Sequence, residues 1–222
     1  MDFVFLSDTV LFRGMRPPDV EGMLECLGAR QRSYEKGELI HHAGDIIQTM
    51  GLVLSGSVHI ENDGLWGNKD ILNHITPGQI FGETYACIPG EPMMVSVVAA
   101  QSSEILFLDM SRVLTSCSSA CPHHSMLIRN LLAATAQKNL NLSRRIMHTS
   151  AKTIRGRLLS YLSYQAARQG SSTVTIPFNR QQLADYLSVD RSALSGELGK
   201  MQRDGILQVN KNCFTLCGKG CT

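Results

Sequence analysis

The chain has 222 residues, 43% hydrophobic and 18% charged, which is long enough for two domains that each bury a core. It contains no apolar run long enough to span a bilayer, and its acidic start, MDFVFLSDTVLFRG, lacks the basic segment of a secretory signal. Seven cysteines, an odd number at irregular spacing, are typical of reduced thiols rather than of a disulfide framework. We therefore expect a cytoplasmic protein without a membrane segment.

Charge is divided unequally along the chain. Residues 1–109 contain 15 Asp and Glu against 6 Lys and Arg, a net charge of −9. Residues 110–222 contain 4 Asp and Glu against 15 Lys and Arg, a net charge of +11. Such a basic half favours a polyanionic partner, above all nucleic acid, and the alternative is a solvated basic surface.

Residues 1–120 are predicted to form a β-domain. Glycines separate short segments of strand-forming residues, including GLVLSGSVHI, KDILNHI and MVSVVAA, and EILFLDM is the expected last strand. Short strands at this spacing predict an antiparallel barrel or sandwich. A short helix near residues 17–27 is expected before the sheet.

Residues 121–148 are predicted to form one long helix. It begins at Pro122, because proline is tolerated in a first helical turn, and its apolar residues recur four apart. A helix of about 25 residues is nearly 40 Å long, so part of its apolar stripe is interpreted as a dimer interface. The alternative is a helix that packs wholly on its own domain. The apolar pairs are Leu127 with Leu131 and Leu142 with Ile146. The TSAK segment that follows is interpreted as the cap of a second helix.

Residues 149–222 contain the segment that most clearly indicates a function, NRQQLADYLSVDRSALSGELGKMQRDGIL. Asn179 and Gln182 have the spacing of a capping box, and Asp190 can cap a second helix after a tight turn. Gly205 is expected to end that helix, and a hairpin around residues 210–212 is interpreted as a wing. The pattern predicts a winged helix-turn-helix.

The second helix of this motif is predicted to read DNA, because residues near the start of such a helix reach base edges in the major groove. Arg191 can form a bidentate pair with guanine. At the start of the preceding helix, Arg180 is expected at a phosphate, with Gln181 beside it. The predicted DNA-binding residues are Arg180, Gln181, Arg191, Ser192, Ser195, Gly196 and Lys200.

This arrangement resembles the bacterial superfamily of the cyclic AMP receptor protein and the fumarate-nitrate reduction regulator (CRP/FNR). The matching segments are KGELIHHAGD, GLVLSGSV, PGQIFGE and DRSALSGELGKMQRDGIL. The resemblance implies an α+β fold: a cyclic-nucleotide-binding-like β-barrel of the jelly-roll type, a dimerisation helix and a winged helix-turn-helix. It also implies a homodimeric transcriptional regulator that binds a palindromic operator in double-stranded DNA and contacts RNA polymerase. Ser192 stands where many relatives have Glu and Gly196 where many have Arg, so the base preference of the best-known members does not transfer.

The effector pocket is expected around Phe81, Gly82 and Glu83, with Met93 and Met94. In relatives that bind cyclic nucleotides, the resemblance places the Arg and Ser that grip the cyclic phosphate at positions 93 and 94. A thioether offers only a weak acceptor where a phosphate needs a cation or N–H donors. We therefore expect a signal other than cyclic AMP, and interpret the two methionines as pocket filler.

Cysteine offers another sensing chemistry. Cys117, Cys121 and His123 lie close together in sequence at the start of the long helix, where a thiolate has a depressed pKa, and form a candidate metal or redox site. A haem or iron–sulfur cofactor with redox or gas sensing stays an alternative, as does a true cyclic-nucleotide receptor. The effector, the target genes and the direction of regulation are open. No nucleophile–base pair or phosphate loop is evident, so no enzymatic activity is expected.

Overall fold

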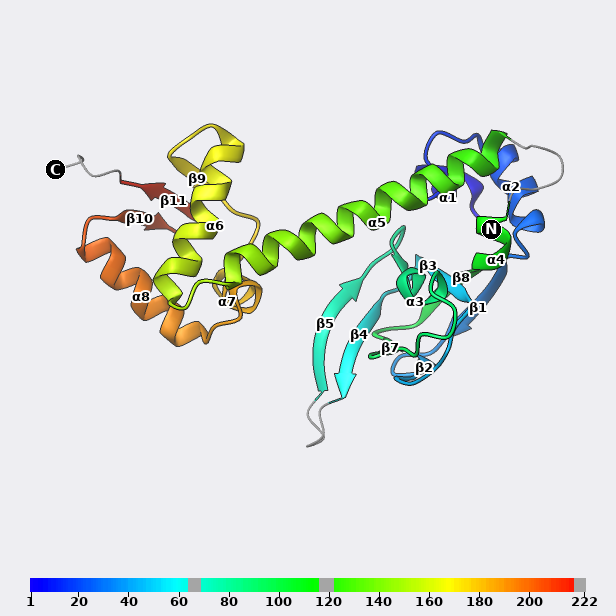
Figure 1. The fold of residues 1–222 in the computed structure, drawn as a ribbon, viewed down its shortest axis with the longest axis horizontal. Coiled ribbons are helices and arrows are strands. Elements are labelled where there is room, and N and C mark those ends of the chain that lie inside the picture. The colour runs from blue at the N-terminus through cyan, green and yellow to red at the C-terminus, as the bar shows by residue number, and fades with distance from the viewer. Residues whose placement is uncertain (64–68, 116–121, 218–222) are drawn as a thin grey trace. The chain divides into compact units, whose positions relative to one another are not determined.

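The computed structural model describes residues 1–63, 69–115 and 122–217, which form two compact units, Met1–Ala136 and Gln137–Thr222 (Figure 1). Each unit has a core of its own. Within the described residues, no helix is both long and apolar enough to cross a membrane.

The first unit is built around two four-stranded antiparallel sheets. One sheet has the order β1 (Arg30–Tyr34), β8 (Ser103–Asp109), β3 (Thr49–Ser55), β6 (Ile80–Phe81). The other has the order β2 (Leu39–His41), β7 (Ser96–Ala99), β4 (Val58–Asp63), β5 (Lys69–Ile75). The described strands therefore form the predicted jelly-roll-like domain as a two-sheet sandwich rather than as one closed barrel.

The sheet containing β8 buries both of its faces, because successive side chains of a strand point to opposite sides. Ile105 and Phe107 belong to the apolar cluster that also holds β4 and β7 residues of the second sheet. Leu106 and Leu108 belong to a cluster that includes residues of α1 (Phe3–Asp8), α2 (Pro17–Cys26) and α4 (Met110–Leu114). The helix predicted near residues 17–27 is thus confirmed as α2 and covers the outer face of this sheet.

The predicted long helix is confirmed as α5 (Pro122–Thr149). Its first half packs on the first unit: Leu127 and Leu131 are buried in the same apolar cluster as residues of α1, α2 and α4. The Asn130 amide donates to the carbonyls of Leu11 and Arg13 at 2.8 and 2.9 Å. In its second half, Leu142 is 61% exposed and Ile146 is 67% exposed.

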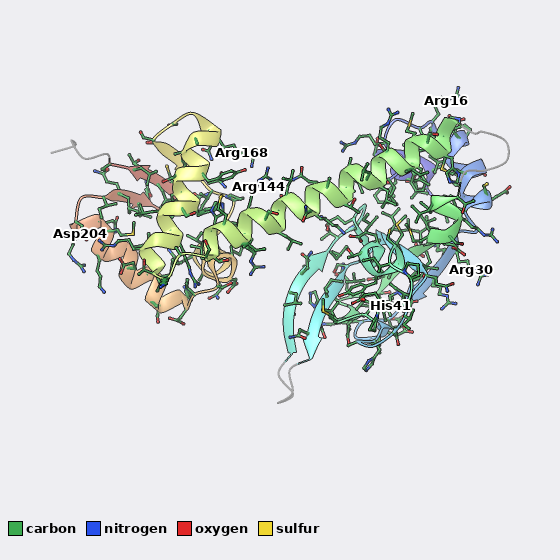
Figure 2. All side chains as sticks on the ribbon, in the orientation of Figure 1. Arg16, Arg30, His41, Arg144, Arg168 and Asp204 are labelled. Atoms are coloured by element: carbon green, nitrogen blue, oxygen red, sulfur yellow. The ribbon has the colours of Figure 1, made fainter. Side chains whose placement is uncertain are left out.

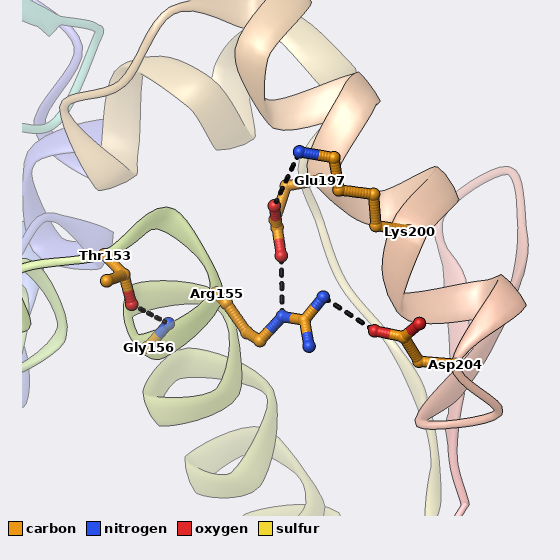
Figure 3. A network of polar contacts seen from close by, with 6 residues as sticks. All are labelled: Thr153, Arg155, Gly156, Glu197, Lys200 and Asp204. Atoms are coloured by element: carbon orange, nitrogen blue, oxygen red, sulfur yellow. Dashed lines mark hydrogen bonds and ion pairs between the residues drawn. The ribbon is translucent and has the colours of Figure 1, made fainter.

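The second unit contains α6 (Ile154–Gln169), α7 (Arg180–Leu187), α8 (Arg191–Arg203) and a small sheet. The sheet has the order β10 (Leu207–Asn210), β11 (Cys213–Leu216), β9 (Thr173–Thr175), so the predicted wing hairpin gains a third strand. The cap predicted in TSAK is wrong. Thr153 caps α6 instead, accepting from the Gly156 amide at 3.0 Å, because the residues before it form the bend between two helices (Figure 3).

Candidate nucleic-acid interface and effector pocket

The helix-turn-helix forms for local reasons that the sequence already contained. Asn179 and Gln182 exchange side-chain and backbone hydrogen bonds, each at 2.9 Å, which closes the predicted capping box of α7. Ser188 adopts the left-handed conformation, with φ of 53°, and turns the chain. The Asp190 carboxylate then accepts from the Ala193 amide at 2.8 Å and begins α8. The two predicted helices and their turn are confirmed.

The α8 helix has one apolar and one polar face. Leu194, Leu198 and Met201 are buried, as predicted. The residues predicted to read bases are all exposed: Arg191, Ser192, Ser195, Gly196 and Lys200. The Ser192 hydroxyl donates to the Asp190 carboxylate, which together with the Ala193 amide lowers the pKa of that carboxyl. Ser192 therefore supports the helix cap as well as facing solvent.

Glu197 is the one carboxylate between Arg191 and Arg203, and it turns toward α6 (Figure 3). Its Oε1 accepts from Arg155 Nε at 2.6 Å, and Lys200 Nζ lies 3.9 Å from its other oxygen. Arg155 also contacts Asp204 at 2.8 Å, and the two hydrogen bonds raise its pKa. The network neutralises Glu197, so the exposed first turns of α8 carry no uncompensated negative side chain.

Two further arginines hold the turn between α7 and α8. Arg145 donates to the carbonyls of Asp185 and Tyr186 at 3.0 and 3.2 Å, at the end of α7. Arg157 Nη1 donates to the carbonyls of Leu187 and Ser188 at 3.0 and 2.9 Å. The last carbonyls of a helix lack partners within the helix, and basic side chains satisfy them. Sequence reasoning counted these arginines only as net positive charge.

Arg180 lies at a pocket of about 500 Å³ that is also lined by Lys211 and Asn212 of the wing hairpin. Its guanidinium is placed over the Phe214 ring at 5.7 Å, and burial lowers its pKa. Its Nη1 is buried and has no hydrogen-bond partner among the described residues. The N–H groups at the start of a helix and two cations together suit an anion. Gln181, also predicted at DNA, is exposed and donates to Asp185 at 2.8 Å.

The predicted effector residues lie in and next to the two-sheet sandwich of the first unit. Phe81 is buried, Gly82 has a φ of 75°, and Glu83 is 3% exposed at the start of α3 (Glu83–Ala86). The Phe81 ring lies directly over Gly51 of β3, where a Cβ atom would sit 2.2 Å from the ring. Only a glycine at position 51 allows this ring position.

The two methionines do not act alike. Met93 is buried in the cluster between the sheets, as expected for a residue that fills the pocket. Met94 is 73% exposed, so its interpretation as filler is wrong; its backbone amide donates to the Tyr85 hydroxyl at 3.3 Å and its side chain faces outward.

Sequence reasoning missed His41 as a residue of this interior. His41 lies on the strands of the first unit (Figure 2), and its ring meets the rings of Phe81 and Phe107 edge-on at 6.3 and 5.9 Å. Burial lowers the pKa of His41, while the nearby Asp45 opposes that change.

The candidate metal or redox site falls largely outside the described residues, because Cys117 and Cys121 are not among them. His123 is described, and its Nε2 lies 3.7 Å from an Asp19 oxygen on α2. The described residues contain no group of three or more His, Cys, Asp or Glu that could hold a metal ion. The haem or iron–sulfur alternative therefore stays a prediction.

Comparison with known proteins follows the same division of the chain. Residues 31–119 match the cyclic nucleotide-binding domain, and residues 156–217 match the Crp-like helix-turn-helix domain. The protein is thus a DNA-binding transcriptional regulator that combines a domain of the cyclic nucleotide-binding type with a helix-turn-helix. It belongs to the CRP/FNR family.

The chain is 26% identical over 204 residues to the cyclic AMP receptor protein of Thermus thermophilus, covering 92% of this chain and 90% of that protein. It is 22% identical over 186 residues to the transcriptional activator protein FnrL of Cereibacter sphaeroides, covering 79% and 71%. Among solved structures, CprK complexed with OCPA matches with a TM-score of 0.62 at 15% identity, covering 89% and 92%. At that identity the structural likeness concerns the fold alone.

Proposed function

We propose that this regulator is a homodimer that binds a two-fold symmetric DNA operator through α8 and responds to a signal other than cyclic AMP. The observation that carries the proposal is the polar face of α8, where Arg191 stands exposed in the first turn while the apolar residues are buried. In helix-turn-helix proteins this part of the second helix contacts base edges. Arg191 is assigned to guanine, and Arg180, with Lys211 across the pocket, to a backbone phosphate.

The dimer interface is assigned to the face of α5 that carries its exposed apolar residues. At 100° per residue, the exposed apolar residues of α5 fall within one half of the helix circumference. These residues are Leu132, Leu140, Leu142, Ile146 and Met147. A contiguous apolar face of this kind on a soluble helix needs a partner, and a second copy of the same helix supplies one.

We propose that the effector is a molecule without a phosphate group. The segment from Phe81 to Val98 contains no Lys or Arg, and its Glu83 is buried. Met93 occupies part of the interior where a ligand would otherwise lie. A phosphate there would lack the charge-assisted hydrogen bonds that normally hold it. Isothermal titration calorimetry of the full chain with cyclic AMP should detect no binding, and stoichiometric binding would contradict this part of the proposal.

The DNA assignment is tested by selecting operators from random duplexes and measuring affinity for the selected and an unrelated sequence. Arg191→Ala should reduce the preference for the operator by about 1–3 kcal/mol, because one bidentate base contact is lost. Arg168→Ala is the matched control, since Arg168 is exposed in the last turn of α6 and carries the same charge (Figure 2). Unchanged preference in Arg191→Ala would show that α8 is not the reading helix.

Arg180→Ala should instead weaken binding to both duplexes equally, with a smaller salt dependence by about one unit of slope. The oligomeric state is measured separately by sedimentation. Ile146→Glu should yield monomers and Arg168→Ala should not. A parent protein that sediments as a monomer at all concentrations would contradict the homodimer.

A further inference from the structure

A histidine pair on the sensory sandwich has no part in the proposed function. His59 on β4 and His74 on β5 are directly opposite each other in the antiparallel register. Their ring centroids are 5.0 Å apart, with the planes inclined by 55°. Side chains directly opposite in adjacent strands are the closest neighbours in a sheet, so the backbone itself holds the two rings together.

The separation fits two imidazoles that share one metal ion. Zinc and similar ions bind an imidazole nitrogen at about 2.0–2.1 Å, which places the ring centroid about 3.2 Å from the metal. Two such rings at a tetrahedral angle have centroids about 5 Å apart. The observed 5.0 Å matches this value. A cation would therefore enter with little movement of either strand.

Surrounding groups also suit a metal. The Nδ1 atom of His59 lies 3.8 Å from Oε1 of Glu61, whose side chain is 11% exposed, and Nε2 of the same ring is left for a metal. Carboxylates beside the non-ligating nitrogen commonly orient metal-bound histidines and increase their basicity. His74 is exposed, and β5 is at the edge of its sheet, so the pair is open to ions from solvent.

We infer that His59 and His74 form a binding site for a divalent first-row transition metal ion that joins β4 to β5. Imidazole nitrogen suits zinc, nickel, cobalt and copper, with affinity rising toward copper. The described residues supply two nitrogens and no third protein ligand, so water completes the coordination. The bound ion would hold the β4–β5 hairpin together, because it adds a cross-link between the strands.

A plain stacking pair is the competing explanation, since opposed aromatic rings also stabilise a sheet. Substitution by phenylalanine separates the two, because H59F and H74F keep a ring at each position and remove the ligand. The full-length protein is titrated with nickel by calorimetry under reducing conditions. His42→Ala is the matched control: His42 is an exposed histidine of the same unit, with its Nδ1 2.6 Å from the Ala43 carbonyl.

We expect one nickel per chain in the parent and in the control, and binding at least roughly 10- to 100-fold weaker in H59F and in H74F. Loss of an outer-shell partner alone costs about that much, so loss of a ligand should cost no less. Nickel should also slow backbone hydrogen exchange in β4 and β5 of the parent but not of H59F. The ligand type is checked by the absorption of cobalt, which should show no thiolate charge-transfer band.

Equal nickel affinity in the parent and both phenylalanine variants would overturn the assignment, as would a parent that binds no nickel. A thiolate band with cobalt would also overturn it, because the metal would then be held by cysteine. Each result is independent of DNA binding, so the site and the proposed operator recognition stand or fall separately.

Discussion

Arg157→Ala should loosen the helix-turn-helix without touching its DNA-facing surface. The Arg157 guanidinium donates to three carbonyls: Ala151 at 2.9 Å from Nε, and Leu187 and Ser188 at 3.0 and 2.9 Å from Nη1. Ser188 is in the left-handed conformation, which a residue other than glycine adopts at a cost of about 1 kcal/mol or more. Arg157 thus fastens a turn that the chain would not otherwise favour.

The magnitude follows from these contacts. Hydrogen bonds from a charged donor contribute about 1.5–3 kcal/mol each when buried. Arg157 is only half-buried, and water can replace part of each bond, so we take about 1 kcal/mol per carbonyl. Opening of α7 and α8 breaks the two bonds to Leu187 and Ser188, together about 2 kcal/mol, which corresponds to roughly 30-fold more frequent opening. Arg157→Lys should recover less than half, because an ammonium cannot reproduce the planar fork.

Hydrogen exchange measured by mass spectrometry on the full chain is the direct assay, because it reports on α7 and α8 separately from the first unit. Arg168→Ala, on the same helix and with the same loss of charge, is the control. Faster exchange confined to the helix-turn-helix in Arg157→Ala is the expected result. Exchange rates within about twofold of those of the Arg168→Ala protein would refute a stabilising role of Arg157 in the turn, because an exposed charge contributes little to stability.

Two further predictions concern packing and protonation. Gly51→Ala should lower the stability of the first unit by about 2 kcal/mol, because its Cβ would collide with the Phe81 ring. Gly22→Ala on α2, where nothing lies within 4 Å of the added Cβ, should raise that stability by about 1 kcal/mol. Unfolding in urea measures both changes, and equal midpoints for the two variants would contradict both predictions. His148, fully buried among three tyrosine rings, has a pKa lowered from 6.5 by burial. As pH falls through 6.5, the unfolded chain takes up the proton first, so the stability of the second unit should decrease and then level off below the folded pKa. Calorimetry of His148→Phe should show a weaker pH dependence of stability. An unchanged pH dependence would exclude this histidine as the cause.

Local signals explain why the helix-turn-helix was predictable. The capping box at Asn179, the Asp190 cap and the stop at Gly205 each act over three or four residues, and each is where the sequence placed it. Short runs of strand-forming residues between glycines likewise indicated the strands of the first unit. Such features depend on short-range geometry that one sequence displays in full.

Long-range contacts explain what was missed. Nothing near position 94 distinguishes an outward methionine from the inward one at position 93, because the side that faces the core depends on where the sheets lie. His41 lies between two phenylalanines more than 35 residues away in sequence. The TSAK cap failed because Thr153, the residue directly after this segment, offered an equally good hydroxyl.

The positive charge of the second half shows most clearly why composition alone overestimates a binding surface. Its net charge of +11 favours DNA, and the family supports that function. Three of the arginines in this half nevertheless bind groups inside the second unit: Arg145 and Arg157 donate to backbone carbonyls, and Arg155 contacts two carboxylates. A guanidinium held by such bonds still contributes to the long-range field, which steers association, but it has fewer N–H groups left for a close contact with a phosphate or a base. The charge therefore has two separate uses in this fold: Arg145, Arg155 and Arg157 hold the helices of the second unit together, whereas Arg180 and Arg191 are the two arginines that we propose to contact DNA.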